Sequence, residues 1–215
     1  MNIDILHQTS EFCVVNKPRG MSVHNDPGMD VCSILQKKFN SSVFPVHRLD
    51  RQTSGVLICA RKKGFVHVLQ VALGEGTKEY RAIVRGVVTN KDGDWTLSLS
   101  DRAEGRKNPR GKANMRKRTH TSYRLMSNNQ HCSMLSFVLH TGRQHQLRKH
   151  CALARHEIIG DTRYGDPRYQ KKISARYEFS GMTLHAHRID CTINGTSHSF
   201  SCLPIGWECF SLPIL

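Results

Sequence analysis

Residues 47–60 of the chain read HRLDRQTSGVLICA. The last five of them, 56–60, are apolar without interruption, and this pattern predicts a central strand that is buried on both faces. Asp50 precedes the strand and lies between Arg48 and Arg51. Because nearby positive charge favours an ionised carboxyl group, Asp50 can act as a nucleophile or a base. A turn or capping aspartate is the alternative, since loops use Asp most often in that way.

The segments on either side of this strand alternate between two hydrophobic periods. Helical spacing occurs over 31–39, over 65–73 with Gly74 as the expected C-cap, and after residue 144. Residues after Gly160 are expected to form loops and strands. Short apolar runs or period-two alternation predict strands at 12–15, 80–84, 95–99, 135–139 and 183–189. Strands without regular helical crossovers predict an α+β fold on a mixed, largely antiparallel sheet.

The positive charge of the chain is concentrated in one part of the sequence. The 215 residues hold 32 Lys and Arg against 17 Asp and Glu, a formal net charge of +15. Residues 101–155 contain 13 Lys and Arg but only two acids, Asp101 and Glu104, and carry a net +11. This concentration favours a polyanionic partner such as nucleic acid. The alternative is a solvated basic surface that only keeps the protein soluble.

Residues 102–118 contain eight of these basic residues among Gly, Pro and Asn, without helical or strand periodicity. We expect a long mobile loop whose cationic side chains are not buried and bind phosphate groups. The residues assigned to this contact are Arg106, Lys107, Arg110, Lys112, Arg116, Lys117 and Arg118.

Residues 141–150, TGRQHQLRKH, form another candidate site where a strand gives way to a helix. Gly142 allows a close backbone approach, and Thr141 with Gln144 at the N3 position fits a capping box. The N-terminus of a helix that begins here can hold an anion.

The helix is expected to bury one face, made of Leu147, Cys151 and Ala154. Arg148 lies one position from that face, so it can reach into a cleft and pair with a carboxylate. Lys149 and Arg155 are expected to be solvated.

Tyr80 shares a strand face with Ala82 and Val84 and follows Glu79. A lone tyrosine at this spacing is usually a core residue. An aromatic ring beside a carboxylate can instead stack on a nucleobase and present its hydroxyl group.

The cysteine and histidine spacings argue against a bound metal. None of the eight cysteines forms a C-x-x-C pair, and no histidines with metal-ligand spacing share a helix face. A reducing cytoplasm explains the cysteines better than a disulfide scaffold does. Those with apolar neighbours, which are expected in the core, are Cys13, Cys59 and Cys151.

Three other classes of protein are disfavoured: membrane-spanning proteins, secreted proteins and NTPases. The longest apolar run, residues 56–60, is too short to span a bilayer. Residues 1–10 lack a basic start followed by an apolar stretch, which argues against a secretory signal. The phosphate loop G-x-x-x-x-G-K-[ST] is missing, which argues against an NTPase. We expect a cytoplasmic monomer that uses neither a membrane nor a nucleotide cofactor.

Taken together, the motifs resemble those of the RluA-type family of RNA pseudouridine synthases. Any one of them is a weak signal, but the ordered set over about residues 10–190 is specific. The motifs that carry the resemblance are NKPRGMSVH at 16–24, HRLDRQTSG at 47–55, KEYRAIVRG at 78–86, TGRQHQLRKH at 141–150, IIGDTRYG at 158–165 and LHA at 184–186.

The resemblance implies a single catalytic domain over residues 1–215, with no S4-like RNA-binding domain before it. It implies a bisected mixed sheet with flanking helices and a central basic cleft. The implied reaction is the isomerisation of a specific uridine to pseudouridine in structured RNA, either rRNA or tRNA, without a cofactor or a metal.

The resemblance also implies roles for individual residues. The target base must leave its stack. Asp50 is then the nucleophile, Tyr80 stacks on the uracil, and Arg148 pairs with Asp50 and keeps it ionised. Arg48 enters the vacated space, and Leu147 packs beneath the base. The other residues assigned to substrate binding are Thr53, Arg143 and His145.

Two alternative functions remain, each from a different functional class than pseudouridine synthesis. One is a catalytically silent RNA-binding or ribosome-assembly protein, which the presence of Asp50, Tyr80 and Arg148 in one chain disfavours. The other is a nuclease that uses Asp50 and His47 as acid and base, which lacks a second carboxylate or a metal site.

Overall fold

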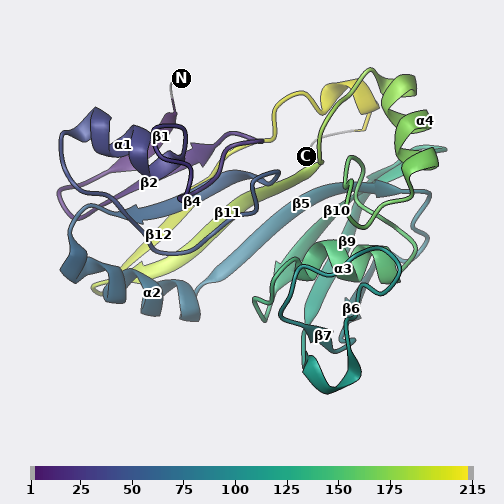
Figure 1. Ribbon diagram of the computed structural model, residues 1–215, viewed down its shortest axis with the longest axis horizontal. Helices are drawn as coiled ribbons and strands as arrows, with labels where there is room; N and C mark the ends of the chain where they lie inside the picture. The colour runs from purple at the N-terminus through teal and green to yellow at the C-terminus, as the bar shows by residue number, and fades with distance from the viewer. Residues whose placement is uncertain (1–2, 213–215) are drawn as a thin grey trace. The chain divides into compact units, whose positions relative to one another are not determined.

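The computed structural model describes residues 3–212, which form two compact units (Figure 1). Unit 1 comprises residues 3–79 and 185–204, and unit 2 comprises residues 80–184 and 205–212. Both units combine mainly antiparallel strands with a few helices, so the predicted α+β class is confirmed. None of the helices in the described part of the chain has the length and apolar content that crossing a bilayer requires.

The strands of unit 1 form a mixed sheet in the order β1-β2-β4-β11, with β3 paired to β4 and β12 to β11. β4 and β11 run parallel, whereas the other pairings described for this unit are antiparallel. The bounds are β1 Asp4–Gln8, β2 Phe12–Lys17, β3 Phe44–Pro45, β4 Ser54–Ala60, β11 Leu184–Ile193 and β12 Thr196–Ser201. The helical elements are α1 Val31–Phe39, η1 Lys63–Phe65 and α2 Val66–Glu75.

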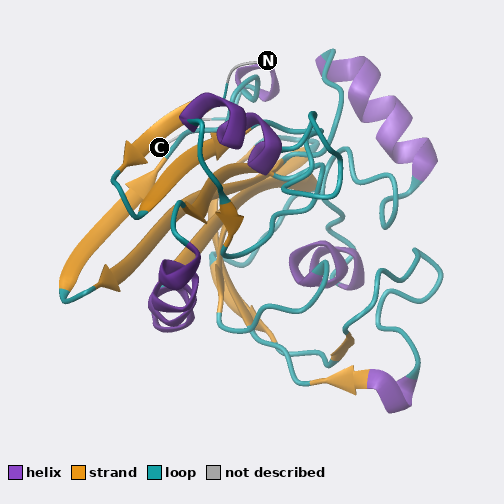
Figure 2. Cartoon of the chain, turned by 60° about the vertical axis from the view of Figure 1, so that its left-hand side comes forward, coloured by secondary structure: helices purple, strands orange, loops and turns teal. Residues whose placement is uncertain are grey.

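Strand β4 is the strand predicted from residues 56–60, and its apolar residues are fully buried. Val56 and Ile58 pack in one cluster with Leu69 of α2. Cys59 points to the opposite face, where its thiol contacts Cys32 of α1. Helices therefore cover both faces of this strand, and Figure 2 shows helices on both sides of the strands.

Helix α2 ends later than expected. Gly74 lies inside the helix, and the C-cap is Gly76, whose N–H donates to the Ala72 carbonyl at 3.0 Å. A Cβ atom at Gly76 would lie 2.4 Å from the Asp190 carbonyl oxygen. The close approach of strand β11 thus requires a residue without a side chain at the end of the helix.

Unit 2 contains a second run of strands in the order β5-β10-β9-β6. The chain enters this unit within β5. The bounds are β5 Thr77–Arg85, β6 Asp92–Trp95, β9 Thr121–Asn128 and β10 Cys132–Leu139, with β7 Leu99–Ser100 and β8 Arg116–Lys117 paired separately. The helical elements are η2 Ala113–Met115, α3 Gln146–Leu153, α4 Pro167–Tyr177 and η3 Glu208–Phe210.

One strand prediction in this unit needs correction. The strand expected over 95–99 is interrupted, because the Leu97 carbonyl accepts hydrogen bonds from the side chains of Thr119 at 2.7 Å and His150 at 3.2 Å. Strand β5 places Tyr80 against the cluster that contains Ala82 and Val84, the strand face predicted from the alternation, and its opposite face is also covered at Arg81 and Ile83.

Helix α4 was not expected, since residues after Gly160 were assigned to loops and strands. It begins with Pro167 at its first position, and the Asp166 side chain accepts from the Arg168 N–H at 2.9 Å. Asp followed by Pro is a helix-start signal that the sequence carried. The helix packs through Ile173 against the cluster that contains Ile83.

Gly160 offers a test of packing in unit 2. It has φ +80°, and an added Cβ would lie 1.8 Å from the Gly181 carbonyl oxygen. We expect Gly160→Ala to lower the unfolding free energy by about 3 kcal/mol or more, measured by urea denaturation.

Gly206→Ala is the matched control, because Gly206 has φ +79° and no heavy atom nearer than 3.8 Å to the added Cβ. Its unfolding free energy should fall only by the cost of placing a residue with a Cβ atom at positive φ, about 1–2 kcal/mol. Equal losses in the two variants would contradict the proposed backbone clash.

Candidate active site

Asp50 lies on a turn directly before β4. The Thr53 N–H donates to the Asp50 carbonyl at 3.0 Å, which closes a four-residue turn. Thr53 is buried, Asp50 is half-buried and Arg48 is exposed. This segment therefore carries a half-buried aspartate two residues after an exposed arginine.

A second turn, from the NKPRG motif, holds this one in place. The Gly20 N–H donates to the Arg51 carbonyl at 2.8 Å, and the Arg51 Nε donates back to the Gly20 carbonyl at 2.9 Å. The Lys17 ammonium group donates to the carbonyls of Arg51 at 3.2 Å and Met21 at 2.7 Å. Two motifs that lie about thirty residues apart in sequence are thus joined through the backbone of the Asp50 turn.

Lys17 is fully buried. Burial lowers the pKa of its ammonium group to about 7, and the charge of Asp50 acts in the opposite direction. Near pH 7 the group is therefore partly neutral, and in its charged form it is stabilised by carbonyl oxygens and by the Asp50 carboxylate.

His47 has a structural role in this unit. Its Nε2 accepts the Ile58 N–H at 3.0 Å. Burial and then the charge of Lys78 lower the pKa of His47 to about 4. The ring is therefore neutral near pH 7, as an acceptor of a backbone N–H must be at that nitrogen.

The LHA motif lies beside the Asp50 signature. His185 is the register partner of Ser54 in the parallel β4–β11 pair. Its Nε2 lies 3.0 Å from the Cys202 carbonyl, so Nε2 carries the hydrogen, and Nδ1 accepts from the Ser54 hydroxyl at 2.9 Å. The residue that follows Thr53 is thereby fixed to the neighbouring strand.

The loop before α3 differs from the predicted capping box. Helix α3 begins at Gln146, and its N-cap His145 has φ 56° and makes no side-chain capping bond. The Gln146 Oε1 accepts from the Thr141 hydroxyl at 2.8 Å and from the Arg143 N–H at 3.1 Å. Gln144 was thus wrongly expected at the N3 position, because the left-handed residue delays the helix.

Arg148 makes a buried ion pair within unit 2. Its Nε and Nη2 lie 2.7 and 2.9 Å from the two carboxylate oxygens of Asp161. Asp161 also accepts the N–H groups of Arg163 at 2.9 Å and Tyr164 at 3.1 Å. Asp161 belongs to the IIGDTRYG motif, but no role was predicted for it. The predicted pairing of Arg148 with Asp50 stays a prediction.

The expectation of a solvated Lys149 was wrong. Lys149 is fully buried, and its Nζ donates to the Ser100 carbonyl at 2.8 Å. Burial lowers the pKa of its ammonium group, while the charges of Glu104 and Asp101 raise it. Helix α3 is enclosed on more sides than its apolar pattern indicated, although Arg155 just beyond it is exposed as expected.

Unit 2 brings together several of the predicted site residues. Leu147 is buried in the apolar cluster against which Tyr80 packs. The His145 Nδ1 lies 3.0 Å from the Tyr164 hydroxyl, and the Arg148 guanidinium lies 5.2 Å from the Tyr164 ring centre. The arginine motif and the 158–165 motif therefore form one packed assembly.

The basic stretch 102–118, called the basic loop below, is anchored by the acids Asp101 and Glu104 and by two of its own arginines. Asp101 accepts the Gln144 N–H at 2.9 Å, and Glu104 accepts the Ser100 hydroxyl at 2.8 Å. Arg116 donates to the Gly111 carbonyl at 2.7 Å, and Arg110 donates to the Ser98 carbonyl at 3.4 Å. The remaining cations assigned to phosphate contact are exposed: Arg106, Lys107, Lys112, Lys117 and Arg118.

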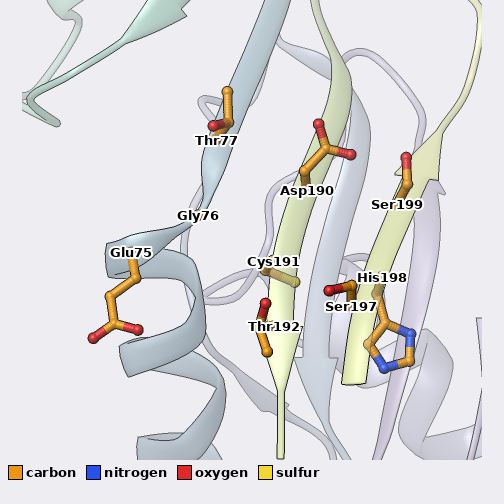
Figure 3. A pocket seen from close by; sticks show the side chains of 9 residues that line it. All are labelled: Glu75, Gly76, Thr77, Asp190, Cys191, Thr192, Ser197, His198 and Ser199. Atoms are coloured by element: carbon orange, nitrogen blue, oxygen red, sulfur yellow. The ribbon is translucent and has the colours of Figure 1, made fainter. Parts of the chain in front are cut away.

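A pocket of about 400 Å³ opens elsewhere in unit 1, at the end of α2 beside β11 and β12 (Figure 3). None of the predicted site residues lines it. Its two acidic residues, Glu75 and Asp190, do not suit a polyanion.

Comparison with known proteins adds a family match. Residues 11–153 match the family model described as RNA pseudouridylate synthase. A tRNA pseudouridine synthase C of Haemophilus ducreyi is 31% identical over 213 residues, covering 89% of this chain and 86% of that protein. A ribosomal large subunit pseudouridine synthase C of Buchnera aphidicola is 32% identical over 202 residues, covering 86% of this chain and 61% of that protein.

The fold is also similar to solved structures. The human RNA pseudouridylate synthase domain containing 4 superposes with a TM-score of 0.80 at 23% sequence identity, covering 98% of this chain and 94% of that one. The human RNA pseudouridylate synthase domain containing 1 gives a TM-score of 0.80 at 21% identity, with 97% and 87% covered.

Lys17 gives a prediction for pH dependence. Its pKa is about 7 in the fold against 10.5 ordinarily, so the unfolded chain binds more protons between these values. The contribution of Lys17 to stability is complete above pH 10.5 and is lost as the pH falls through about 7. We expect the unfolding free energy of wild type minus that of Lys17→Met to rise with pH in this window, by up to about 1.4 kcal/mol per unit.

Urea denaturation of both proteins across this window measures the slope. Lys37→Met, which removes an exposed lysine, should follow the wild-type pH dependence. Parallel curves for wild type and Lys17→Met would show that Lys17 titrates normally.

The Arg148–Asp161 pair gives a prediction for stability. Arg148→Met leaves a buried carboxylate without its cation, so the unfolding free energy should fall by about 3–5 kcal/mol. Arg148→Lys keeps the charge but not the two parallel bonds, and its loss should be smaller. Arg155→Met, at an exposed position, should change stability by less than about 0.5 kcal/mol. A similarly small change in Arg148→Met would refute the buried pair.

Proposed function

The chain belongs to the RNA pseudouridylate synthase family, and we propose that it isomerises a specific uridine to pseudouridine in structured tRNA or rRNA with Asp50 as the nucleophile. Relatives named for tRNA and for the large ribosomal subunit supply the two RNA classes. The exposed cations of the basic loop suit either polyanion.

The observation that carries this proposal is the fixed Asp50 turn. Its backbone is bonded to the NKPRG turn through Arg51, and the residues after it are fixed in β4. A nucleophile gains from a rigid support, because a positioned group loses little orientational freedom on reaction. The exposed Arg48 lies on the same segment, where it can occupy the space that a flipped base leaves.

The proposed reaction exchanges one glycosidic bond for another. The uridine flips out of its stack, and Asp50 attacks the ribose at C1′ as the bond from C1′ to N1 breaks. The detached uracil rotates, and its C5 forms the new bond to C1′ as the bond between Asp50 and C1′ breaks, which restores the Asp50 carboxylate. C5 then loses its hydrogen to solvent as a proton, and N1, freed from C1′, takes up a proton from solvent, so no atom is gained or lost overall.

The other site residues have supporting roles in this proposal. Tyr80, on the cluster that contains Leu147, stacks on the uracil, and Leu147 packs beneath it. Arg148 has five N–H donors, of which Asp161 takes two, and the proposal assigns it a second carboxylate partner in Asp50. The pair with Asp161 then serves to orient the guanidinium group.

The nuclease alternative needs His47 as an acid or base beside Asp50, and His47 does not suit that role. His47 would have to exchange a proton near pH 7, but its Nε2 accepts a backbone N–H and its pKa lies at about 4. A silent RNA-binding protein is separated by experiment, because only a synthase releases tritium from C5 of uridine without cutting the strand.

We expect Asp50→Asn to abolish tritium release from C5-labelled bulk cellular RNA while RNA affinity changes by only a few fold. The reason is that one carboxylate supplies the nucleophile, whereas the exposed cations supply the binding. Filter binding and gel analysis of the same RNA report affinity and strand integrity.

Asp4→Asn makes the same chemical change on the exposed start of β1 and should keep wild-type turnover. Residual turnover of Asp50→Asn at a tenth of the wild-type rate would exclude Asp50 as the nucleophile. Absence of tritium release by the wild-type protein would reject the proposed activity itself.

A further inference from the structure

Helix α4 has a charged face that neither the core nor the proposed mechanism uses. The helix buries Gln170 and Ile173 and contains no acidic residue. Its basic residues are all exposed and give the helix a charge of +4; they are Arg168, Lys171, Lys172 and Arg176. These positions follow one another at steps of three, one and four residues, so they form a stripe on one side of the helix.

The stripe is arranged at a cost to the stability of the helix. Arg168 and Lys172, and Lys172 and Arg176, are like-charge pairs at the i, i+4 spacing, each of which costs about 0.2–0.5 kcal/mol. Arg168 also lies in the first turn, where the helix dipole disfavours a cation. In residues 3–212, no ion pair involves Arg168, Lys171 or Lys172. Neither ion pairing nor burial therefore gives Arg168, Lys171 and Lys172 a role in folding.

The stripe adjoins the basic loop within unit 2. Arg163 donates to the carbonyls of Ala103 at 3.1 Å and Glu104 at 3.4 Å, both at the start of the loop. Arg106 of the loop lies 3.7 Å from Asp166, the N-cap of α4. The start of the basic loop, with Arg106, therefore lies next to the N-terminal end of α4.

We propose that the stripe on α4 is an additional RNA-binding surface, which holds the phosphate backbone of the substrate RNA outside the reacting nucleotide. The proposal rests on the proposed function for the identity of the RNA. Arg168 and Arg176 are separated by about 12 Å along the helix axis, so the stripe can contact more than one phosphate group.

Other occupants fit the stripe less well. A second copy of this chain, with a net charge of +15, would be repelled. A membrane surface requires exposed apolar residues beside the cations, but Tyr169, Ile173 and Tyr177 pack into the core cluster. An acidic protein matches the charge, although RNA is favoured because the stripe is next to the basic loop.

The test variant combines Arg168→Gln, Lys171→Gln and Lys172→Gln, since Gln keeps helix propensity and removes the charges. Arg176 is retained because its side chain bonds with Tyr177. With an unmodified tRNA transcript as the probe, the slope of log K against log salt should flatten by about two units if all three residues contact phosphate. With bulk cellular RNA as the substrate, KM should rise about tenfold while kcat stays unchanged.

The control removes three exposed lysines from unit 1, in the combination Lys37→Gln, Lys38→Gln and Lys63→Gln. It makes the same change in net charge and should alter the slope by less than about one unit. Equal effects of the two triple variants would mean that only the overall field matters and would overturn the proposal. An unchanged slope and KM in the α4 variant would also overturn it and would leave an acidic protein as the occupant.

The readouts separate this inference from the proposed function. Failure of the wild-type protein to release tritium would reject the synthase activity, and the salt slope would still decide whether α4 binds RNA. Normal tritium release together with an unaffected slope in the α4 variant would reject the RNA-binding surface alone.

Discussion

The ammonium group of Lys17 is buried beneath the turn that carries Asp50 and bonds to the backbone of that turn at Arg51. A buried cation is costly unless oxygen atoms surround it, so the two turns must stay together while the protein is folded. This requirement fixes the start of β4, and β4 in turn fixes the register of β2 and β11. The proposed nucleophile thus lies on a turn that backbone hydrogen bonds hold to the NKPRG motif.

Unit 2 uses buried cations in the same way. Arg148 ties α3 to the 158–165 motif through Asp161, and Lys149 ties α3 to Ser100 at the base of the basic loop. The basic residues of this chain therefore have two separate uses. Buried ones join motifs that are distant in sequence, while exposed ones on the loop and on α4 remain available to a polyanion.

The wrong sequence predictions in unit 2 have one distant and two local causes. Lys149 was expected in solvent because its neighbours are polar, yet its acceptor is the carbonyl of Ser100. The capping box was assigned to Gln144 because the spacing fits, whereas the positive φ of His145 moves the helix start to Gln146. Helix α4 was missed although Asp166 and Pro167 signal a helix start, since its apolar residues are few.

The sequence by itself determined the α+β class, the buried β4, the concentration of positive charge and, through the ordered motifs, the family. These features depend on local periodicity, on composition and on residue order, all of which can be read along one chain. Only the tertiary structure decided which carboxylate pairs with Arg148 in unit 2, which carbonyls enclose Lys17 and Lys149, and which arginines of the basic loop are held internally. The reason is that a side chain finds its partner through burial and hydrogen-bond geometry, and neither is set by distance along the sequence.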